Sequence, residues 1–319
     1  MTFSLSTNCF SSRATHGATM ARTARELGFD ALELGYRLTD AQARQIAHCV
    51  GQGTITTPSV HAYCPEPESV PSGHPELYLL ASTDPDESAM AAIFLRRTLE
   101  FAKRVEARAI VLHTGRVRGC WFHSNDLMER AEVFAERGID PFSDKGLRLR
   151  ARANNWSRAR RVKKHFKVLQ RQLDAIIPLC QKADVVLCME NLPSREAIPD
   201  PGEAESFIAS YNSRHLRYWH DIGHAEVQAR MQWAPDATET ARRLLRITAG
   251  VHIHDVKNFS TDHLAPGRGQ IDFKALAFYG AADVIRVLEP APGTSETEMR
   301  DGLAFIRQCW SNQQPLSKA

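Results

Sequence analysis

The sequence has no long apolar run and no hydrophobic leader. A transmembrane helix needs roughly 18 or more consecutive apolar residues, and no such stretch occurs. Residues 1–17, MTFSLSTNCFSSRATHG, have neither the basic start nor the apolar segment of a signal peptide. We therefore expect a cytoplasmic protein without a membrane partner.

The cysteines are scattered and follow no pattern. The chain has seven cysteines, and no two of them form a Cys-x-x-Cys pair. This excludes the cysteine frameworks of small disulfide-rich domains and of thiolate zinc fingers. We expect reduced thiols.

The chain also lacks a strong excess of charge of either sign. Its 40 basic and 37 acidic residues leave a net charge of +3, so overall charge argues neither for nor against a polyanionic partner. One segment, 148–172, nevertheless holds ten Lys or Arg residues. It would serve either as a lid that binds the phosphate of a sugar phosphate or of DNA, or as a solvated helix. The apolar stripe Phe166, Leu169, Leu173 and Ile176 favours the helix.

Short β-like runs alternate with amphipathic helical segments along the whole chain. The predicted strands are 3–8, 31–35, 59–63, 109–115, 185–191, 216–221, 250–255 and 284–289. Eight strands that each precede a helix predict a parallel (β/α)8 TIM barrel, and roughly 250 residues are typical of that fold. We therefore expect residues 1–319 to form one domain.

Two intervals between strands are too long for one βα unit. Polar residues at the predicted strand ends are otherwise 28 to 37 positions apart, but 52 positions separate His61 from His113 and 77 separate His113 from Glu190. We predict loop insertions at 64–85 and 115–160, on the rim formed by the carboxyl ends of the strands.

Six strands end in an imidazole or a carboxylate. These residues are His61, His113, Glu190, Asp221, His252 and Glu289. In a barrel the carboxyl ends of the strands converge on one rim, where active sites are built. Buried charges must be paired or coordinate a metal, so a divalent cation is expected there. Mixed carboxylate and imidazole ligands suit Zn, Mn, Co or Fe.

Several short motifs carry a family resemblance. They are SVHAY (59–63), VLHTG (111–115), CMENLP (188–193), WHDIGHA (219–225), VHIHD (251–255), DHLAPGRGQIDF (262–273) and VLE (287–289). In order and spacing they resemble the xylose-isomerase-like TIM barrel superfamily, which contains sugar isomerases and epimerases and the zinc-dependent apurinic endonucleases.

The epimerase branch implies one metal held by Glu190, Asp221, His252 and Glu289. In that branch Glu190 and Glu289 would also move a proton through a metal-stabilised enediolate. His224 would then contact a substrate hydroxyl.

The resemblance to the endonuclease branch implies a cluster of three metals. Its ligands would be His61, His113, Glu190, Asp221, His224, His252, His263 and Glu289. That branch also needs an acid at position 261, where this chain has Thr261, and Asp262 directly precedes His263. This departure argues against a third metal and ranks the nuclease second.

Further residues are predicted around the substrate. Arg268 lies in a glycine-rich loop. It would either clamp a carboxylate or phosphate of the substrate or serve only to stabilise the loop. Glu33 would either reach a substrate hydroxyl or stabilise the rim. His61 and His113 would line the substrate site where they hold no metal.

The remaining polar residues of these motifs are assigned supporting roles. His254 shares the inward face of its strand with His252 and is expected to support the ligands rather than bind metal. Asn191 would orient Glu190, Trp219 would pack against the neighbouring helix, and His220 would be structural.

The favoured function is a metal-dependent isomerase or epimerase of a small sugar, sugar phosphate or hydroxy-carbonyl compound. An apurinic endonuclease-like phosphodiesterase is the alternative, which would make nucleic acid a partner. A lyase or dehydratase acting on a keto-sugar and a non-catalytic sugar binder remain open. Relatives of this fold are often dimers or tetramers, so a homo-oligomer is compatible with the sequence.

Overall fold

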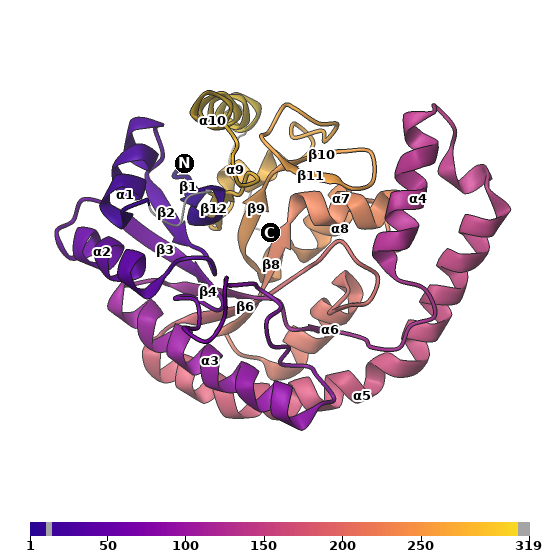
Figure 1. Ribbon diagram of the computed structural model, residues 1–319, viewed down its shortest axis with the longest axis horizontal. Helices are drawn as coiled ribbons and strands as arrows, with labels where there is room; N and C mark the ends of the chain where they lie inside the picture. The colour runs from indigo at the N-terminus through magenta and orange to yellow at the C-terminus, as the bar shows by residue number, and fades with distance from the viewer. Residues whose placement is uncertain (11–14, 312–319) are drawn as a thin grey trace.

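In the computed structural model, which describes residues 1–10 and 15–311, eight parallel strands close into a barrel (Figure 1). They are β1 (Ser4–Ser6), β2 (Ala31–Leu34), β3 (Thr56–His61), β4 (Ala109–Leu112), β6 (Val186–Glu190), β8 (Leu216–Asp221), β9 (Thr248–Ile253) and β12 (Ile285–Leu288). Each strand pairs with the next in chain order, and Ser4 opposite Val287 closes the ring. The predicted (β/α)8 barrel is confirmed, and each predicted strand overlaps a barrel strand.

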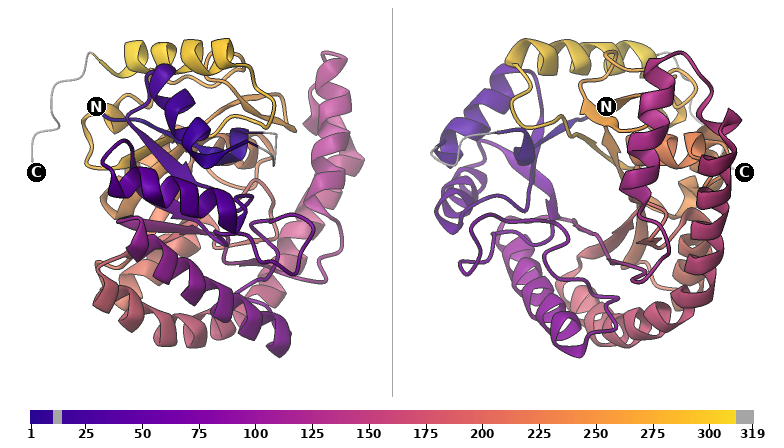
Figure 2. Two further views of the ribbon diagram at one scale, coloured as in Figure 1. Left: turned by 60° about the vertical axis from the view of Figure 1, so that its left-hand side comes forward. Right: turned by 45° about the vertical axis from the view of Figure 1, so that its right-hand side comes forward.

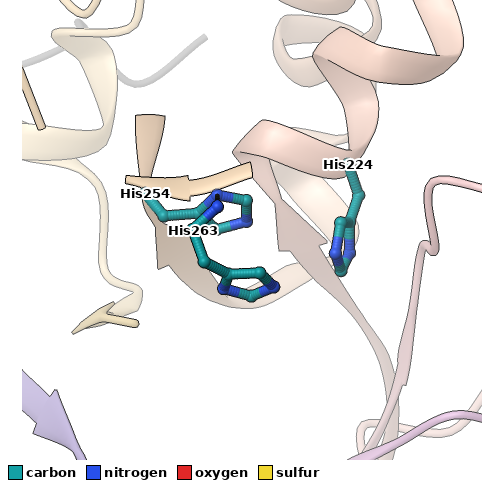
Figure 3. A group of neighbouring side chains, drawn as sticks. All are labelled: His224, His254 and His263. Carbon is teal, nitrogen blue, oxygen red and sulfur yellow. Dashed lines mark hydrogen bonds between the residues drawn. The ribbon is translucent and has the colours of Figure 1, made fainter. Parts of the chain in front are cut away.

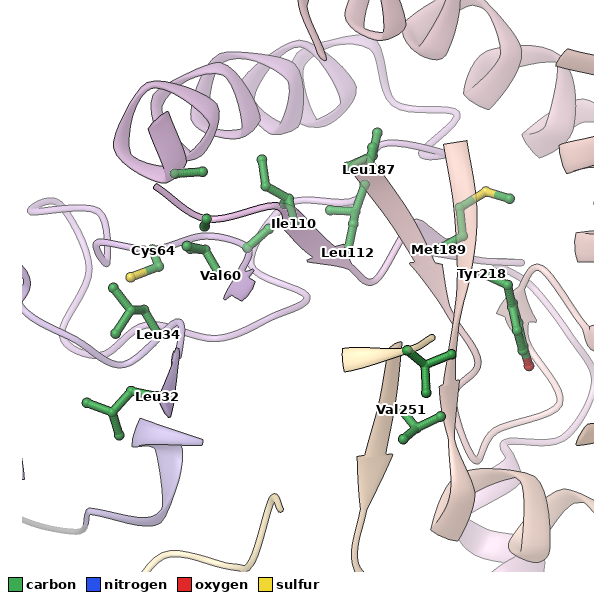
Figure 4. Packing of buried hydrophobic residues seen from close by; sticks show 14 of the residues in the cluster. Leu32, Leu34, Val60, Cys64, Ile110, Leu112, Leu187, Met189, Tyr218 and Val251 are labelled. Carbon is green, nitrogen blue, oxygen red and sulfur yellow. The ribbon is translucent and has the colours of Figure 1, made fainter. Parts of the chain in front are cut away.

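Alternation along the strands divides the apolar side chains between two cores. Ile110 and Leu112 of β4 point outward into the large core between strands and helices (Figure 4). Ala109 and Val111 belong to a smaller cluster with Cys188, Trp219, Ile285 and Val287. Strands buried on both faces explain why the sequence reads as continuous apolar runs.

Trp219 does not pack against a helix as the sequence suggested. Its side chain is fully buried in the smaller cluster of strand residues, and its ring meets His252 edge-on at 5.2 Å. Gly250 on the adjacent strand makes room, because a Cβ there would lie 2.2 Å from the indole. Trp219 therefore packs directly against a predicted metal ligand.

Helices surround the barrel (Figure 1). They are α1 (Gly17–Glu26), α2 (Asp40–Gly51), α3 (Pro85–Arg104), α4 (Ser124–Glu136), α5 (Lys145–Ala183), α6 (Pro201–Tyr211), α7 (Ile222–Arg230), α8 (Ala237–Leu244), α9 (Phe278–Ala281) and α10 (Glu296–Trp310). Capping boxes begin α2, α6 and α10, where the pairs Thr39 with Gln42, Asp200 with Glu203, and Ser295 with Glu298 satisfy free amide groups.

Two short antiparallel ribbons and three 3-10 turns complete the described part. β5 (Gly115–Arg116) pairs with β7 (Ala197–Ile198), and β10 (Asp255–Lys257) pairs with β11 (Thr261–Leu264). The turns are η1 (Thr7–Cys9), η2 (Pro141–Ser143) and η3 (Leu245–Ile247).

The two predicted insertions differ in structure. Residues 64–84 form neither helix nor strand. The interval 115–160, predicted as a loop, instead contains α4 and the first part of α5, which we call the helical arm (124–160). The arm stands beside the barrel (Figure 2) and packs Leu127 and Leu147 against Val227 of α7.

The basic segment is helical, as its apolar stripe predicted. Leu169, Leu173 and Ile176 are buried and Phe166 is partly buried. Not every basic side chain faces water, because Arg158 is buried and donates to both carboxylate oxygens of Glu203, at 2.7 and 2.6 Å. This bidentate ion pair joins α5 to α6.

All seven cysteines lie in the described part and are free. Among the described residues, no helix has the combination of length and apolar character that crossing a membrane requires.

Candidate metal centre

Four predicted ligand side chains from consecutive barrel strands meet at the rim. Glu190 ends β6, Asp221 ends β8, His252 lies on β9 and Glu289 follows β12. Each contributes a ligand atom, and these atoms lie within 4.8 Å of one another. All four residues are buried. We call this group the carboxylate centre.

His252 lies at the middle of the carboxylate centre. Its Nδ1 is 2.7 Å from Glu190 Oε1, 3.2 Å from Glu289 Oε2 and 3.7 Å from Asp221 Oδ2. Its Nε2 lies 2.9 Å from Glu33 Oε1, and the other oxygen of Glu33 accepts from Ser59 Oγ at 2.7 Å. Glu33 thus bonds the His252 ring on the side away from the other three carboxylates, and both carboxylate oxygens of Glu33 have buried partners.

A second group forms where Glu190 meets two histidines. His61 Nε2 and His113 Nε2 lie 3.2 and 3.1 Å from Glu190 Oε2. His61 Nδ1 donates to the carbonyl of Ala62 at 2.9 Å, which leaves Nε2 facing the carboxylate. Because its Oε1 faces the carboxylate centre, Glu190 belongs to both groups.

A third group contains His224, His254 and His263 (Figure 3). Asp221 connects it to the carboxylate centre, since Asp221 Oδ1 lies 3.0 Å from His254 Nε2. Thr261 is exposed and belongs to no ligand group among the described residues, and neither does Asp262. His254 lies with His224 and His263, in the group for which the endonuclease branch would need an acid at position 261.

The electrostatics of the carboxylate centre favour ionised carboxylates beside protonated imidazoles. Burial alone would raise the pKa of Glu190, but His252 and His113 lower it well below its usual range. Burial alone would lower the pKa of His252, but Glu289, Glu33 and Glu190 raise it well above its usual range. The pKa values of Asp221 and Glu289 are lowered as well, against burial, by neighbouring histidines.

The donor set fits a divalent cation. Three ligand carboxylates and Glu33 are buried around one imidazole, an excess of negative charge that must be balanced in the interior. Oxygen and nitrogen donors without thiolate are the set that Zn, Mn, Co and Fe share. The Nε2 of His252 is bonded to a carboxylate, as in metal sites where a second carboxylate orients a histidine ligand.

Three residues at the rim escaped the sequence analysis. Asn8 Nδ2 and Ser6 Oγ donate to Glu289 Oε1 at 3.1 and 3.4 Å. Tyr36 lies edge-on to His61 with ring centroids 5.1 Å apart, and burial together with Glu289 raises its pKa. Asn8 follows the first strand, but the rule that selected the other strand ends counted imidazoles and carboxylates and therefore passed over an amide.

Two predicted residues have different contacts from those expected. Asn191 does not orient Glu190; its amide exchanges two hydrogen bonds of 2.9 Å with the backbone of Asp221, across neighbouring strands. Arg268 is not brought to the ligand groups, because its half-exposed guanidinium faces Asp301 of α10 at 4.0 Å. The amides of Gly267 and Gly269 bond Asp255 and fix the loop in this orientation.

His220 lies outside the three ligand groups. Its Nδ1 is 2.6 Å from the Tyr279 hydroxyl, and burial lowers its pKa to about 4. It is a neutral, buried histidine, which agrees with the structural role expected for it.

The fold and the rim together define a class of protein, a TIM barrel whose strand ends carry clustered histidine and carboxylate side chains that could hold metal. The chain belongs to the xylose isomerase-like TIM barrel family, whose sequence profile matches residues 21–309. No curated protein sequence matches it significantly.

Solved structures share the fold over nearly the whole chain. A D-tagatose 3-epimerase-like protein is 18% identical, with a TM-score of 0.68 and 98% of each chain covered. The 3-keto-D-glucoside 4-epimerase YcjR from E. coli is 14% identical, with a TM-score of 0.67, covering 97% of this chain and all of that one. A family 2 AP endonuclease from Brucella melitensis is 14% identical, with a TM-score of 0.63 and coverage of 96% and 98%. At these identities the likeness shows the fold, and both branches predicted from the motifs are represented.

Proposed function

We propose that the protein is a divalent-metal-dependent isomerase or epimerase of a small sugar or related hydroxy-carbonyl compound. The observation that carries the proposal is the convergence of Glu190, Asp221, His252 and Glu289 within 4.8 Å of one another. The sugar epimerases among the structural neighbours support the choice of substrate class.

In this proposal the four residues hold the cation, which supplies Lewis-acid polarisation of a substrate carbonyl and its neighbouring hydroxyl. Glu33 keeps His252 oriented through Nε2, so that Nδ1 faces the other three ligands. Asn191 holds the backbone of Asp221 and thereby fixes where that carboxylate lies.

Glu190 and Glu289 are the proposed acid and base. They approach His252 Nδ1 from strands β6 and β12, which lie on different sides of β9. One carboxylate removes the proton from the carbon next to the substrate carbonyl, and the other delivers a proton to the opposite face, which inverts that carbon. Their lowered pKa values keep both carboxylates ionised at rest, so either can act as the base, and the one that acts as the acid must first take up a proton from solvent.

The residues proposed for substrate contact surround this pair. Tyr36 and His113 are the partly exposed side chains beside His61 and Glu190. His224 lies beyond Asp221, with Nδ1 bonded to the Asn191 carbonyl at 3.1 Å. Hydroxyl groups of a sugar are both donors and acceptors and suit these partners.

A second candidate is a phosphodiesterase related to the apurinic endonucleases. The observation that favours it is the presence of two further ligand groups beside the carboxylate centre. Several cations would stabilise the attacking and leaving oxygens of a phosphodiester.

The discriminating experiment follows proton exchange rather than a single substrate. Metal-loaded protein is incubated in deuterium oxide with a panel of ketoses and their phosphates, and NMR detects deuterium at the carbon next to the carbonyl. We expect incorporation with at least one substrate and its loss in Glu190→Gln and Glu289→Gln. Absence of exchange across the panel, together with cleavage of abasic-site DNA by the same preparation, would overturn the isomerase in favour of the phosphodiesterase.

A further inference from the structure

We propose that the exposed face of α5 and the loop beside it bind the surface of an anionic phospholipid bilayer, with two tryptophans at the headgroup level and cations against the lipid phosphates. This basic aromatic face consists of Trp121, Leu149, Arg152, Trp156, Arg160 and Lys163. The proposal does not rest on the proposed function. It departs from the sequence-based expectation of no membrane partner, which rested on the lack of a spanning segment and of a leader.

Exposed apolar side chains are concentrated in and beside the helical arm. Eight large apolar side chains are exposed in the described part of the chain, and five of these lie between residues 121 and 156: Trp121, Val133, Ile139, Leu149 and Trp156. Trp121 and Leu149 are 56% and 55% exposed, and Trp156 is 45% exposed. Single exposed apolar residues are ordinary on a protein surface, but a group of them marks a surface for interaction.

The two exposed tryptophans are held in place by the fold. Their ring centroids are 5.0 Å apart with the planes at 50°, and the Arg160 guanidinium lies 3.8 Å over the Trp156 ring. The backbone amide of Trp121 donates to Ser157 Oγ at 3.1 Å, which fastens its loop to α5. Both indoles are therefore ordered at the surface before any partner binds.

The face follows one side of α5. Its α5 residues succeed one another at spacings of three or four positions, from Leu149 to Lys163, and cover about 21 Å of helix at the usual rise. Figures 1 and 2 show α5 running around the outer edge of the molecule. A broad surface can therefore approach this side of the helix.

The cations of the face have no acidic partners. α5 contains no acidic residue between its N-cap Asp144 and Asp174. Arg152, Arg160 and Lys163 are exposed, and none of them forms an ion pair with any residue that the structure describes. The exposed acids of the helical arm lie on α4 and the turn after it: Asp126, Glu129, Glu136 and Asp140. Charge complementarity therefore calls for an anionic partner along α5.

The mixture of side chains favours a bilayer over a nucleic acid. A base stacks on an open aromatic face, but Arg160 covers one face of Trp156, and Trp121 packs beside that ring without leaving a parallel slot. An aliphatic side chain such as Leu149 gains nothing from a phosphate, whereas it is buried at the boundary of headgroups and acyl chains. Tryptophan is enriched at that boundary, and anionic lipid attracts Lys and Arg. An anionic bilayer thus uses every residue of the face.

Tryptophan fluorescence tests the aromatic pair directly. The other three tryptophans, Trp219, Trp233 and Trp310, are buried, so a blue shift on adding vesicles reports Trp121 and Trp156. The full-length protein is mixed with vesicles of phosphatidylcholine alone or with about 30% phosphatidylglycerol. We expect a blue shift with the anionic vesicles only, and its loss in the double variant Trp121→Ser with Trp156→Ser.

Co-sedimentation with the same vesicles tests the cations. The double variant Arg160→Gln with Lys163→Gln should bind the anionic vesicles roughly 10- to 30-fold more weakly, because each cation near such a surface accounts for about 5-fold. Raising the salt from about 50 to about 300 mM should weaken binding of the wild type. The matched control is Arg96→Gln with Arg104→Gln, at exposed arginines of α3, which should bind as the wild type does. Circular dichroism checks that each variant is folded.

Absence of both the blue shift and co-sedimentation with anionic vesicles at low salt would overturn the proposal. Equal binding by the α5 variants and the α3 control would overturn it as well, by showing that the contact lies elsewhere. Tighter binding to an oligothymidylate than to the vesicles, weakened by the same α5 substitutions, would replace the bilayer with a nucleic acid. These measurements need neither substrate nor metal, so their outcome is independent of the proposed activity.

Discussion

At the scale of single residues, the clearest feature is that carboxylates flank both ring nitrogens of His252. Nδ1 faces the ligand carboxylates and Nε2 faces Glu33. A buried imidazole in this position offers only one nitrogen to a cation, because the other must stay protonated to bond Glu33. Glu33 thereby determines the nitrogen that His252 presents.

Replacing Glu33 with Gln tests this role. We expect the carboxylate centre to bind metal about 10- to 100-fold more weakly, the usual cost of losing the partner that orients a histidine ligand. Competition with a fluorescent chelator measures the affinity. Glu100→Gln, an exposed glutamate on α3, should behave as the wild type. Equal affinity in Glu33→Gln would show that Glu33 does not act through His252.

His220 gives a prediction for pH. Burial lowers its pKa from 6.5 to about 4, so between these values the unfolded chain binds a proton that the folded chain does not. His220 therefore makes the protein lose stability as the pH falls from 6.5 to 4, by up to ~3 kcal/mol. In the double variant His220→Phe and Tyr279→Phe, which removes both partners of the hydrogen bond, the free energy of unfolding in urea should fall less between pH 6.5 and 4.5. Identical losses in the two proteins would contradict this.

At the scale of secondary-structure elements, the start of α7 connects the helix to the rim. Asp221 caps this helix by accepting the His224 amide at 2.7 Å, and Gly223 in the same first turn lies against His254. A side chain at Gly223 has no space to occupy, since the contact is with a ring and not with a flexible chain end. The helix can begin here only because position 223 lacks a Cβ.

Gly223→Ala and Gly202→Ala form a matched pair, because each glycine is the second residue of a helix. A Cβ added at Gly202 would meet only Asp200 Oδ1, at 3.6 Å, so this substitution should leave stability unchanged or raise it by up to about 1 kcal/mol. Gly223→Ala should cost about 1–3 kcal/mol through overpacking and displace His254. Differential scanning calorimetry measures both. Equal melting temperatures would show that the His254 ring moves aside freely.

At the scale of the whole molecule, the predicted ligands join four separate strands of the second half of the chain. A cation bound by β6, β8, β9 and the residue after β12 binds the folded state and not the unfolded chain. Such binding stabilises by about 2.7 kcal/mol at a free metal concentration of 100 times Kd. We expect removal of metal with a chelator to lower the melting temperature by several degrees and its return to restore it. Calorimetry before and after dialysis checks this, and an unchanged Tm would contradict a metal bound between the strands.

The barrel and its rim were predictable because they depend on regular patterns. Apolar runs of strand length recur with helices between them, and the polar residue that ends a strand must lie on the rim. Side-chain partners were not predictable in this way. That Glu33 bonds His252, or that Asn191 bonds the backbone of Asp221, depends on rotamers and register between strands distant in sequence.

The helical arm shows a second limit. The spacing between His113 and Glu190 revealed the excess length, but not that the excess folds as helix. The first part of α5 continues directly into a barrel helix, and its burial depends on contacts with α7 that no local pattern encodes. Arg158 is a similar case. This residue of the basic segment is buried because its guanidinium is paired with Glu203, a partner that is distant in sequence.

The strict chain order of the barrel strands has a consequence for how such a protein diversifies. The carboxylate centre comes entirely from the last four barrel strands. The second half of the chain also supplies His224, His254 and His263, whereas His61 and His113 come from the first four strands. Recombination between relatives at the midpoint of the gene would exchange the histidines of the first half and transmit a complete ligand set in the second. The proposed ligand set is thus inherited as one segment, whereas Glu33, which orients His252, comes from the other half and would have to be retained in any such exchange.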